Sequence, residues 1–225
     1  MSDDPFNLIA SALSQRDPVV IKSERTRQAI LEAALTFLWS RPFRVMTVRQ
    51  LMAMTEVSRP AFYQYFQDLQ QLMEALLGML ATEILAACEP WITNTGDPVV
   101  LVRESLTGLV SVCHRRGPFV KAIADAATTD ERLERAWLAF VQQFDDTVDK
   151  RIRMDQELKL TAEFDPRPAA HSLNMLNAYT FISKFGRHPR SDPEPVRQAL
   201  IRIWVSTLYG SRWAESECSQ LERIR

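Results

Sequence analysis

TVRQLMAMTEVSRPAFYQYF, residues 47–66, is the stretch that decides how the N-terminal part of this chain folds. Its first residue, Thr47, can cap a helix, because the hydroxyl can accept a free backbone N–H at the helix start. Three apolar residues, Val48, Leu51 and Met52, follow at helical spacing and form one apolar face. The run at 54–57 breaks this pattern, so the stretch opens with a short helix and a turn.

A second short helix is predicted after the turn. Ser58 is a further N-cap, and Pro60 lies in the first turn, where its missing N–H costs nothing. Phe62 and Phe66, four residues apart, face inward. The rest of the helix is shared by Arg59, Ala61, Tyr63, Gln64 and Tyr65. Basic, amide and phenolic groups on a capped short helix are suited to reading the major groove of DNA, so the pattern indicates a helix-turn-helix.

Two short helices joined by a turn also occur in many helical proteins that do not bind DNA. The neighbouring sequence favours the DNA-binding interpretation, because one long helix is predicted to end near Trp39 and another to begin near Gln70. The window 22–68 carries seven cations and four anions, a net charge of +3, whereas the whole chain carries −1. A cationic head on an acidic body is suited to phosphate binding by one end only.

The stretch at 47–66, the preceding RTRQAILEAALTFL and the following DLQQLMEALL resemble the DNA-binding domain of TetR-type transcriptional regulators. The resemblance spans about fifty residues in the same order as in that family. It implies a three-helix head in which Arg59, Tyr63 and Gln64 lie near bases or phosphates. The positions that it implicates in DNA binding are Thr47, Arg49, Ser58, Arg59, Pro60, Ala61, Tyr63, Gln64 and Tyr65.

The chain departs from the family pattern at Leu69, where family members usually carry a lysine that contacts phosphate. The departure removes one expected contact with the DNA backbone. Arg25, Arg44 and Arg49 are the cations that could replace it.

Composition limits the class of protein. The 225 residues permit one large or two modest domains, and only six are glycine, which suits long helices. We found no run of about eighteen uncharged apolar residues and no basic N-terminal region of a signal peptide. We therefore expect a cytoplasmic protein without a membrane span. Three scattered cysteines fit free thiols in a reducing compartment, and the three histidines show no ligand spacing with them, so no metal or cofactor is expected.

Periodicity predicts an all-α fold of about nine helices with no β pattern and no repeat. The predicted long helices run over 23–40, 70–89, 99–114, 130–158, 169–185 and 193–212, with a shorter one over 118–127. Pro90 is expected to end the second of these, and 165–168 is expected to be a linker. The predicted organisation is an arm at 1–21, a DNA-binding domain at 22–68, a ligand-binding and dimerisation domain at 69–215 and a polar tail at 216–225.

Two asparagines in HSLNMLNAYTFISKF suggest a second site. Asn174 and Asn177 are three residues apart and share a helix face with apolar side chains. Burying an unpaired amide costs about 1–3 kcal/mol, so both need partners, either in the protein or on a ligand. Apolar residues at helical spacing are most often core, but an apolar pocket with a few convergent amides is typical of a small-molecule site.

SLNMLNAYTF, LIRIWVSTLYG and RAWLAFVQQF are similar to the helices around the ligand tunnel of the EthR-like subgroup of the TetR family. This resemblance implies a small hydrophobic ligand whose polar contacts are Asn174 and Asn177. It implies walls formed by Leu106, Leu109, Cys113, Trp137, Phe140, Val141, Phe144, Phe181 and Trp204.

A single recognition helix reads only a few base pairs, so such modules pair on palindromic DNA. The family resemblance implies a homodimer formed by the last two long helices. On the last one, Ala199, Ile203, Thr207 and Gly210 form a smooth face, which could instead pack inside the monomer.

These patterns predict a ligand-responsive repressor that a small apolar ligand releases from its operator. An enzyme is disfavoured, since no nucleophile–base pair or carboxylate pair occurs at helical spacing. A helical small-molecule or lipid-binding protein, whose basic head does not read DNA, remains the alternative.

Overall fold

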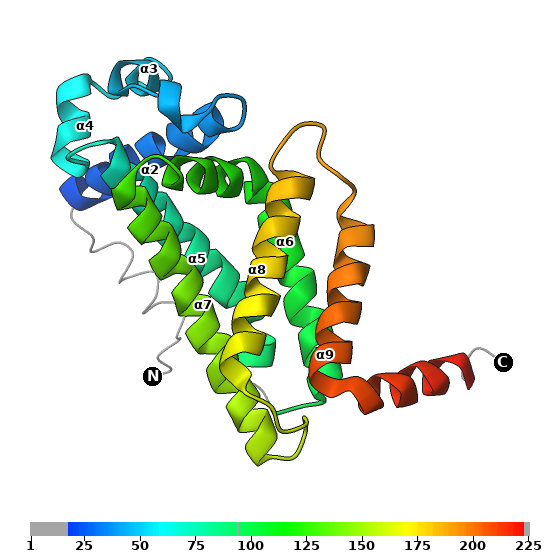
Figure 1. The fold of residues 1–225 in the computed structure, drawn as a ribbon. Helices are drawn as coiled ribbons and strands as arrows, with labels where there is room; N and C mark the ends of the chain where they lie inside the picture. Colours follow the sequence, from blue (N-terminus) through cyan, green and yellow to red (C-terminus); the bar gives the residue numbers. More distant parts are fainter. Residues whose placement is uncertain (1–17, 94, 223–225) are drawn as a thin grey trace, which may run out of the picture. The chain divides into compact units, whose positions relative to one another are not determined.

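The computed structural model describes the backbone of residues 18–93 and 95–222 and the side chains of 23–93 and 95–210. Over these residues the chain forms eight α-helices, one short 3-10 helix and no strand, which confirms the all-α prediction (Figure 1). Residues 1–17 of the predicted arm lie outside the described residues. The remaining arm residues, 18–21, belong to the first described helix, which begins at Pro18. The chain divides into two compact units between Leu72 and Met73.

The first unit contains α2 (Pro18–Leu38), α3 (Val48–Met52), α4 (Arg59–Tyr65) and the first residues of α5 (Leu69–Thr93). The backbone N–H of Gln50 donates to the Thr47 hydroxyl over 3.2 Å, and that of Ala61 donates to the Ser58 hydroxyl over 3.3 Å. Both predicted N-caps are therefore present, and they fix where α3 and α4 begin. The buried core of this unit includes Ile30, Leu31, Phe37, Leu51, Phe62, Phe66 and Leu72.

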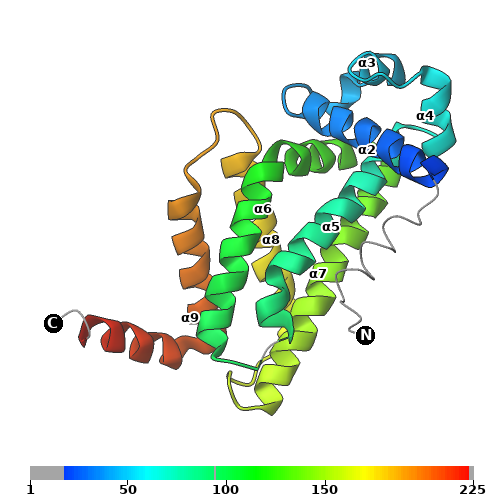
Figure 2. The same ribbon diagram turned by 180° about the vertical axis from the view of Figure 1, so that it is seen from behind.

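The second unit contains the rest of α5, α6 (Pro98–Ala127), α7 (Glu131–Glu157), α8 (Pro166–Phe185) and α9 (Pro193–Glu222). α6 packs against α7, α8 and α9, and α7 packs along α8 (Figures 1 and 2). α8 begins three residues earlier than predicted, because Asp165 caps it by accepting from the Arg167 N–H over 3.1 Å. Pro166 occupies the first turn, where proline is tolerated, so the predicted linker is a cap.

Two prolines that were predicted to bound helices lie inside them, so those predictions were wrong. α5 continues past Pro90 to Thr93. The Ser105 hydroxyl donates to the Cys88 carbonyl over 3.1 Å and accepts from the Trp91 N–H over 3.0 Å, which replaces backbone bonds that proline disrupts. α6 likewise continues past Pro118, and both ribbon views show it changing direction towards its C-terminal end.

α9 also extends beyond the predicted end near 212 and continues to Glu222, so the predicted tail is helical up to that residue. The helix is broken at Tyr209, whose φ and ψ are −128° and 21°. The Thr161 hydroxyl, from the loop after α7, donates to the Leu208 carbonyl beside this break. A side chain that takes over a backbone carbonyl in this way is an established cause of a helix kink.

A buried polar cluster joins α5, α7 and α9 close to the break. Arg151 and Asp155 form an ion pair of 3.1 Å, with side chains only 2% and 1% exposed. The Tyr209 hydroxyl donates to Asp155 over 2.6 Å and accepts from the Trp91 indole N–H over 2.8 Å. The Arg151 guanidinium lies 5.6 Å from the centre of the Trp91 ring. Burial and then the bond to Asp155 raise the pKa of Tyr209, so the phenol remains protonated.

Of the described helices, α5 alone is long and apolar enough to cross a membrane by length and composition, which the sequence analysis did not anticipate. Its Glu74 pairs with Arg132 of α7 over 2.7 Å, and its Glu83 pairs with Arg116 of α6 over 2.6 Å. Four apolar side chains of α5 between these points are buried, namely Leu76, Leu77, Leu80 and Ala81. We interpret α5 as a core helix of a folded domain.

Close packing at Gly117 gives a stability prediction. A Cβ at this position would lie 2.3 Å from the Phe185 carbonyl oxygen, so Gly117→Ala should destabilise the protein by about 1–3 kcal/mol. A Cβ at Gly78, in α5, meets nothing within 4 Å, so Gly78→Ala should stabilise it by about 0.5–1 kcal/mol. Urea unfolding followed by circular dichroism measures both changes. Equal effects of the two substitutions would contradict the close α6–α8 approach.

The buried cluster gives a second stability prediction. Asp155→Ala should cost about 3–5 kcal/mol in the same unfolding experiment, because it leaves the Arg151 charge buried without its carboxylate. Glu131→Ala is the control, since Glu131 is 92% exposed in a pair of 4.0 Å with Arg135. That substitution should change stability by less than about 1 kcal/mol. A small effect of Asp155→Ala would show that the cluster does not hold the three helices.

Candidate functional site

The predicted DNA-binding residues lie on α4 and around the starts of α3 and α4. Seven of them are exposed in the first unit, namely Thr47, Arg49, Ser58, Arg59, Pro60, Tyr63 and Gln64. Ala61 and Tyr65 are half-buried. Over residues 23–93, Arg44, Arg49 and Arg59 form no ion pair, so their charges are available to phosphate.

Two phenylalanines fix the orientation of α4. Phe62 and Phe66 are buried, with ring centres 5.7 Å apart. Tyr63 packs edge-on against Phe62 and leaves 49% of its surface exposed. The Arg27 guanidinium lies 5.4 Å from the centre of the Phe66 ring. The buried rings anchor one face of α4 and leave the basic, amide and phenolic face open.

The second unit contains a partly open cavity of about 100 Å³ lined by residues from α5 to α9. Its wall contains all eleven residues that the sequence analysis assigned to the ligand: Leu106, Leu109, Cys113, Trp137, Phe140, Val141, Phe144, Asn174, Asn177, Phe181 and Trp204. The structure brings these residues together, and their contact with a ligand remains a prediction. The cavity is smaller than the 300–1,000 Å³ or so that is typical of drug-sized ligands, so a larger ligand must displace wall side chains.

The α5 wall of the cavity was missed by sequence reasoning. α5 contributes Leu80, Ile84, Leu85, Cys88, Trp91 and Ile92. The signal was present, because residues 84, 88 and 91 recur at helical spacing, but the expected stop at Pro90 removed Trp91 from the helix. α7 also contributes Thr147 and Val148.

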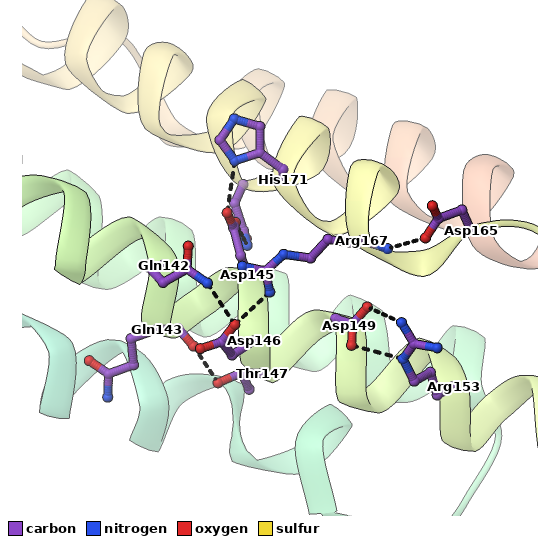
Figure 3. A network of polar contacts seen from close by, with 11 residues as sticks. Gln142, Gln143, Asp145, Asp146, Thr147, Asp149, Arg153, Asp165, Arg167 and His171 are labelled. Atoms are coloured by element: carbon purple, nitrogen blue, oxygen red, sulfur yellow. Dashed lines mark hydrogen bonds and ion pairs between the residues drawn. The ribbon is translucent and has the colours of Figure 1, made fainter.

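The two asparagines have protein partners that the sequence did not indicate. The Asn177 side-chain oxygen accepts from the Trp204 indole N–H over 3.1 Å. The Asn174 side-chain nitrogen donates to Asp145 of α7 over 2.9 Å. Asp145 also contacts His171 Nδ1 at 2.7 Å, across the α7–α8 seam in Figure 3. One polar atom of each side-chain amide is therefore held by a hydrogen bond to another helix of the protein.

Two thiols lie in the cavity wall, Cys88 and Cys113. Burial raises the pKa of Cys88 to about 12 and raises that of Cys113 as well. Both are therefore protonated and unreactive near neutral pH. Over the described residues, no group of three or more His, Cys, Asp or Glu side chains could hold a metal ion.

The predicted dimer face of α9 is exposed. Ala199, Ile203, Thr207 and Gly210 all lie on the surface of the second unit, with Ile203 38% exposed. The alternative, in which this face packs inside the monomer, was therefore wrong. α8 adds Tyr179, which is 73% exposed.

Comparisons with known proteins follow this division of the chain. The family model "Bacterial regulatory proteins, tetR family" matches residues 30–76, and "Transcriptional regulator EthR, C-terminal domain" matches residues 102–210. The HTH-type transcriptional regulator EthR of Mycobacterium tuberculosis is 28% identical over 191 residues, covering 81% of this chain and 86% of the relative. The two models together match more than half of the chain.

Solved structures share the fold. A putative TetR-family regulator from Syntrophomonas wolfei superposes with a TM-score of 0.72 at 16% identity, covering 82% of this chain and 95% of that one. AibR, crystallised with isovaleryl coenzyme A and operator DNA, superposes with a TM-score of 0.62 at 17% identity, covering 81% and 97%.

The relatives are transcriptional regulators, so the prediction that the protein is not an enzyme is confirmed. The exposed basic face of α4 lies in the segment that the first model matches, and the cavity wall contributed by α6 to α9 lies in the segment that the second model matches. The chain belongs to the TetR family of DNA-binding transcriptional regulators, with a C-terminal domain of the EthR type.

Proposed function

We propose that the protein is a cytoplasmic, homodimeric repressor that leaves a palindromic operator when a small apolar ligand fills the cavity. The observation that carries the proposal is the cavity of the second unit, whose mostly apolar wall presents Asn174 and Asn177. A repressor without a ligand would have no need of an internal space bordered by two amides. Filling such a space with apolar side chains would stabilise the protein.

The proposed operator contacts come from the open face of α4. Arg59, Tyr63 and Gln64 are exposed there and supply a cation, a phenol and an amide to base edges or phosphates. Leu69 is the first residue of α5 and cannot contact phosphate by charge. We assign the missing backbone contact to Arg44 and Arg49, which are exposed and form no ion pair over residues 23–93.

The proposed ligand is an elongated apolar molecule with a polar group. Aromatic and aliphatic side chains of the wall would bind its apolar part, and the two asparagines would orient its polar part. The AibR structure contains both isovaleryl coenzyme A and operator DNA, which supports a protein of this fold that binds a small ligand as well as DNA. The walls must also move, since the present cavity holds only a narrow molecule.

The proposed dimer uses α8 and α9. Exposed Ile203 and Tyr179 offer apolar surface on these helices, and Ala199 and Gly210 permit close helix approach. Two paired recognition helices can engage successive major grooves at only one spacing. A ligand would release the operator by binding more tightly to a dimer with another spacing, and only this difference in affinity can shift the equilibrium.

DNA binding can be tested at Arg59. Arg59→Ala should weaken binding to DNA from upstream of the protein's own gene by about 1–3 kcal/mol, because a base or phosphate contact is lost. Fluorescence anisotropy at two salt concentrations measures this affinity and its salt dependence. Arg135→Ala, at a 71% exposed arginine of α7, should leave binding unchanged. Equal affinities for wild type and Arg59→Ala would remove Arg59 from the interface.

Ligand release can be tested with N-pentylheptanamide, an elongated amide. We expect it to displace wild-type protein from the labelled DNA, and Asn177→Leu to require at least about tenfold more, since one good hydrogen bond is lost. Gln143→Leu makes the same change at an exposed amide outside the cavity wall and should respond as wild type does. If wild type stays on DNA at saturating probe, the release mechanism is wrong.

A further inference from the structure

Two basic segments that are far apart in the sequence lie side by side in the second unit, and neither the family match nor the helix pattern gives them a role. They are HRRGPFVK, residues 114–121 of α6, and KFGRHPR, residues 184–190 at the end of α8 and in the loop that follows. Together they contain no acid and carry six cations, which we call the basic surface: Arg115, Arg116, Lys121, Lys184, Arg187 and Arg190.

Two glycines allow the segments to approach closely. A Cβ at Gly117 would lie 2.3 Å from the Phe185 carbonyl oxygen, and one at Gly186 would lie 2.7 Å from the Cβ of Lys121. The His114 ring packs edge-on against Phe185, with ring centres 5.0 Å apart. Both ribbon views show the end of α8 beside the bend of α6 (Figures 1 and 2). Close packing of the two backbones therefore gathers the cations of both segments.

Nearby carboxylates balance only part of this charge. Glu83 pairs with Arg116 over 2.6 Å, and Asp125 pairs with Lys121 over 2.5 Å. Asp192, just after the second segment, is the third acid near the basic surface. Six cations and three acids leave a net charge of +3, whereas the whole chain carries −1. The basic surface is therefore a positive region that composition alone does not indicate, because folding brings its two segments together.

Two cations at the end of α8, Lys184 and Arg187, are exposed. Among the side chains of 23–93 and 95–210, neither forms an ion pair. Lys184 lies in the last turn of α8, where the helix dipole favours a cation, but Arg187 lies beyond the end of the helix. Burial and then the charge of Arg190 lower the pKa of His114, so the positive charge belongs to lysine and arginine and persists above pH 7.

The basic surface lies apart from the cavity and from the proposed dimer face. None of its six residues lines the cavity. Lys184 follows the exposed Tyr179 of α8 by five residues, which places the two side chains about 140° apart around the helix. The basic surface would therefore stay open in the proposed dimer and with a ligand bound.

The chemistry of the basic surface fits the phosphates of a nucleic acid. Four of its six cations are arginines, whose planar guanidinium can bind two phosphate oxygens at once. Surfaces that bind lipid combine cations with large apolar side chains that enter the membrane. Of the large apolar side chains that are exposed in the described residues, none lies in either basic segment. The composition therefore favours a nucleic-acid backbone over lipid headgroups.

We propose that the basic surface is a second DNA-contacting surface, carried by the second unit, which binds phosphates of duplex DNA without reading the base sequence. Lys184 and Arg187 supply contacts for which no carboxylate of the described residues competes, and Arg115, 57% exposed, lies on the neighbouring segment. Phosphate contacts add affinity for any duplex, whereas discrimination between sequences requires base contacts. This surface goes beyond the proposed function, in which the operator contacts come from the first unit.

The test removes two exposed cations together. Lys184→Gln combined with Arg187→Gln should weaken binding to DNA from upstream of the protein's own gene, and to an unrelated duplex of equal length, by the same factor of about ten at 50 mM salt. The slope of log affinity against log salt concentration should become shallower by about one to two, since each phosphate contact contributes about 0.9. Fluorescence anisotropy at several salt concentrations measures the affinity and the slope.

The matched control removes one arginine and one lysine from α7. Arg135→Gln combined with Lys150→Gln changes the net charge by the same amount, at two exposed positions outside the basic surface. Because general electrostatic attraction falls equally in both double variants, only the loss of local phosphate contacts distinguishes them. The control should keep the wild-type salt slope. Equal slopes for the two double variants would overturn the inference.

Two further measurements exclude other causes. Size-exclusion chromatography should give the same oligomer for wild type and for the Lys184 and Arg187 double variant. A smaller oligomer would attribute the weaker binding to assembly and overturn the DNA contact. If DNA affinity is unchanged and only binding to phosphatidylglycerol vesicles is lost, the basic surface serves lipid headgroups and the inference is wrong.

The outcomes separate this inference from the proposed function. The Lys184 and Arg187 double variant should keep the wild-type preference for the upstream DNA over the unrelated duplex, whereas Arg59→Ala should reduce that preference. A wild-type salt slope in the double variant would remove the second surface and leave the role of α4 intact. Failure of wild type to bind either duplex would contradict both.

Discussion

The buried pair of Arg151 and Asp155 is the constraint on which the second unit depends. Two charges removed from water are tolerated only with good mutual geometry and satisfied hydrogen bonds. Tyr209 donates a hydrogen bond to Asp155, and the Trp91 indole ring lies beside Arg151; these two residues come from α9 and α5. Three helices must therefore keep their positions for these contacts to persist. Trp91 also lines the cavity, so the cluster connects the cavity wall to the broken part of α9.

In the proposed mechanism, α5 is the element through which the cavity would influence DNA binding. Its first residues belong to the first unit, and its later residues line the cavity. Glu74 and Glu83 tie it to α7 and α6 by ion pairs, and Trp91 ties its end to Tyr209. Under the proposed mechanism, a ligand that pushed the wall apart would act on this helix directly. The shift in the equilibrium between the two helix positions can be no larger than the ligand's differential affinity for them.

The fold was largely predictable because its signals are local. N-caps at Thr47 and Ser58 and apolar periodicity define α3 and α4 without help from the rest of the chain. The wrongly predicted helix ends arose where tertiary contacts override local rules. The Ser105 hydroxyl accepts from the Trp91 N–H, just after Pro90, where α5 was expected to end. The Thr161 hydroxyl donates to the Leu208 carbonyl beside the break in α9. Resemblance located the wall residues around Asn174 and Asn177. It could not give their partners, because Asp145 and Trp204 lie on other helices.

The distance between the two DNA-binding domains of a dimer tests the proposed release mechanism most directly. A spin label on Gln28→Cys, an exposed α2 position, gives one inter-head distance by double electron–electron resonance. Cys218→Ser removes one competing thiol, and burial raises the pKa of Cys88 and Cys113 so that both label slowly. We predict two distances, whose populations shift towards one on operator DNA and the other on saturating ligand. A single distance that ligand leaves unchanged would contradict the mechanism.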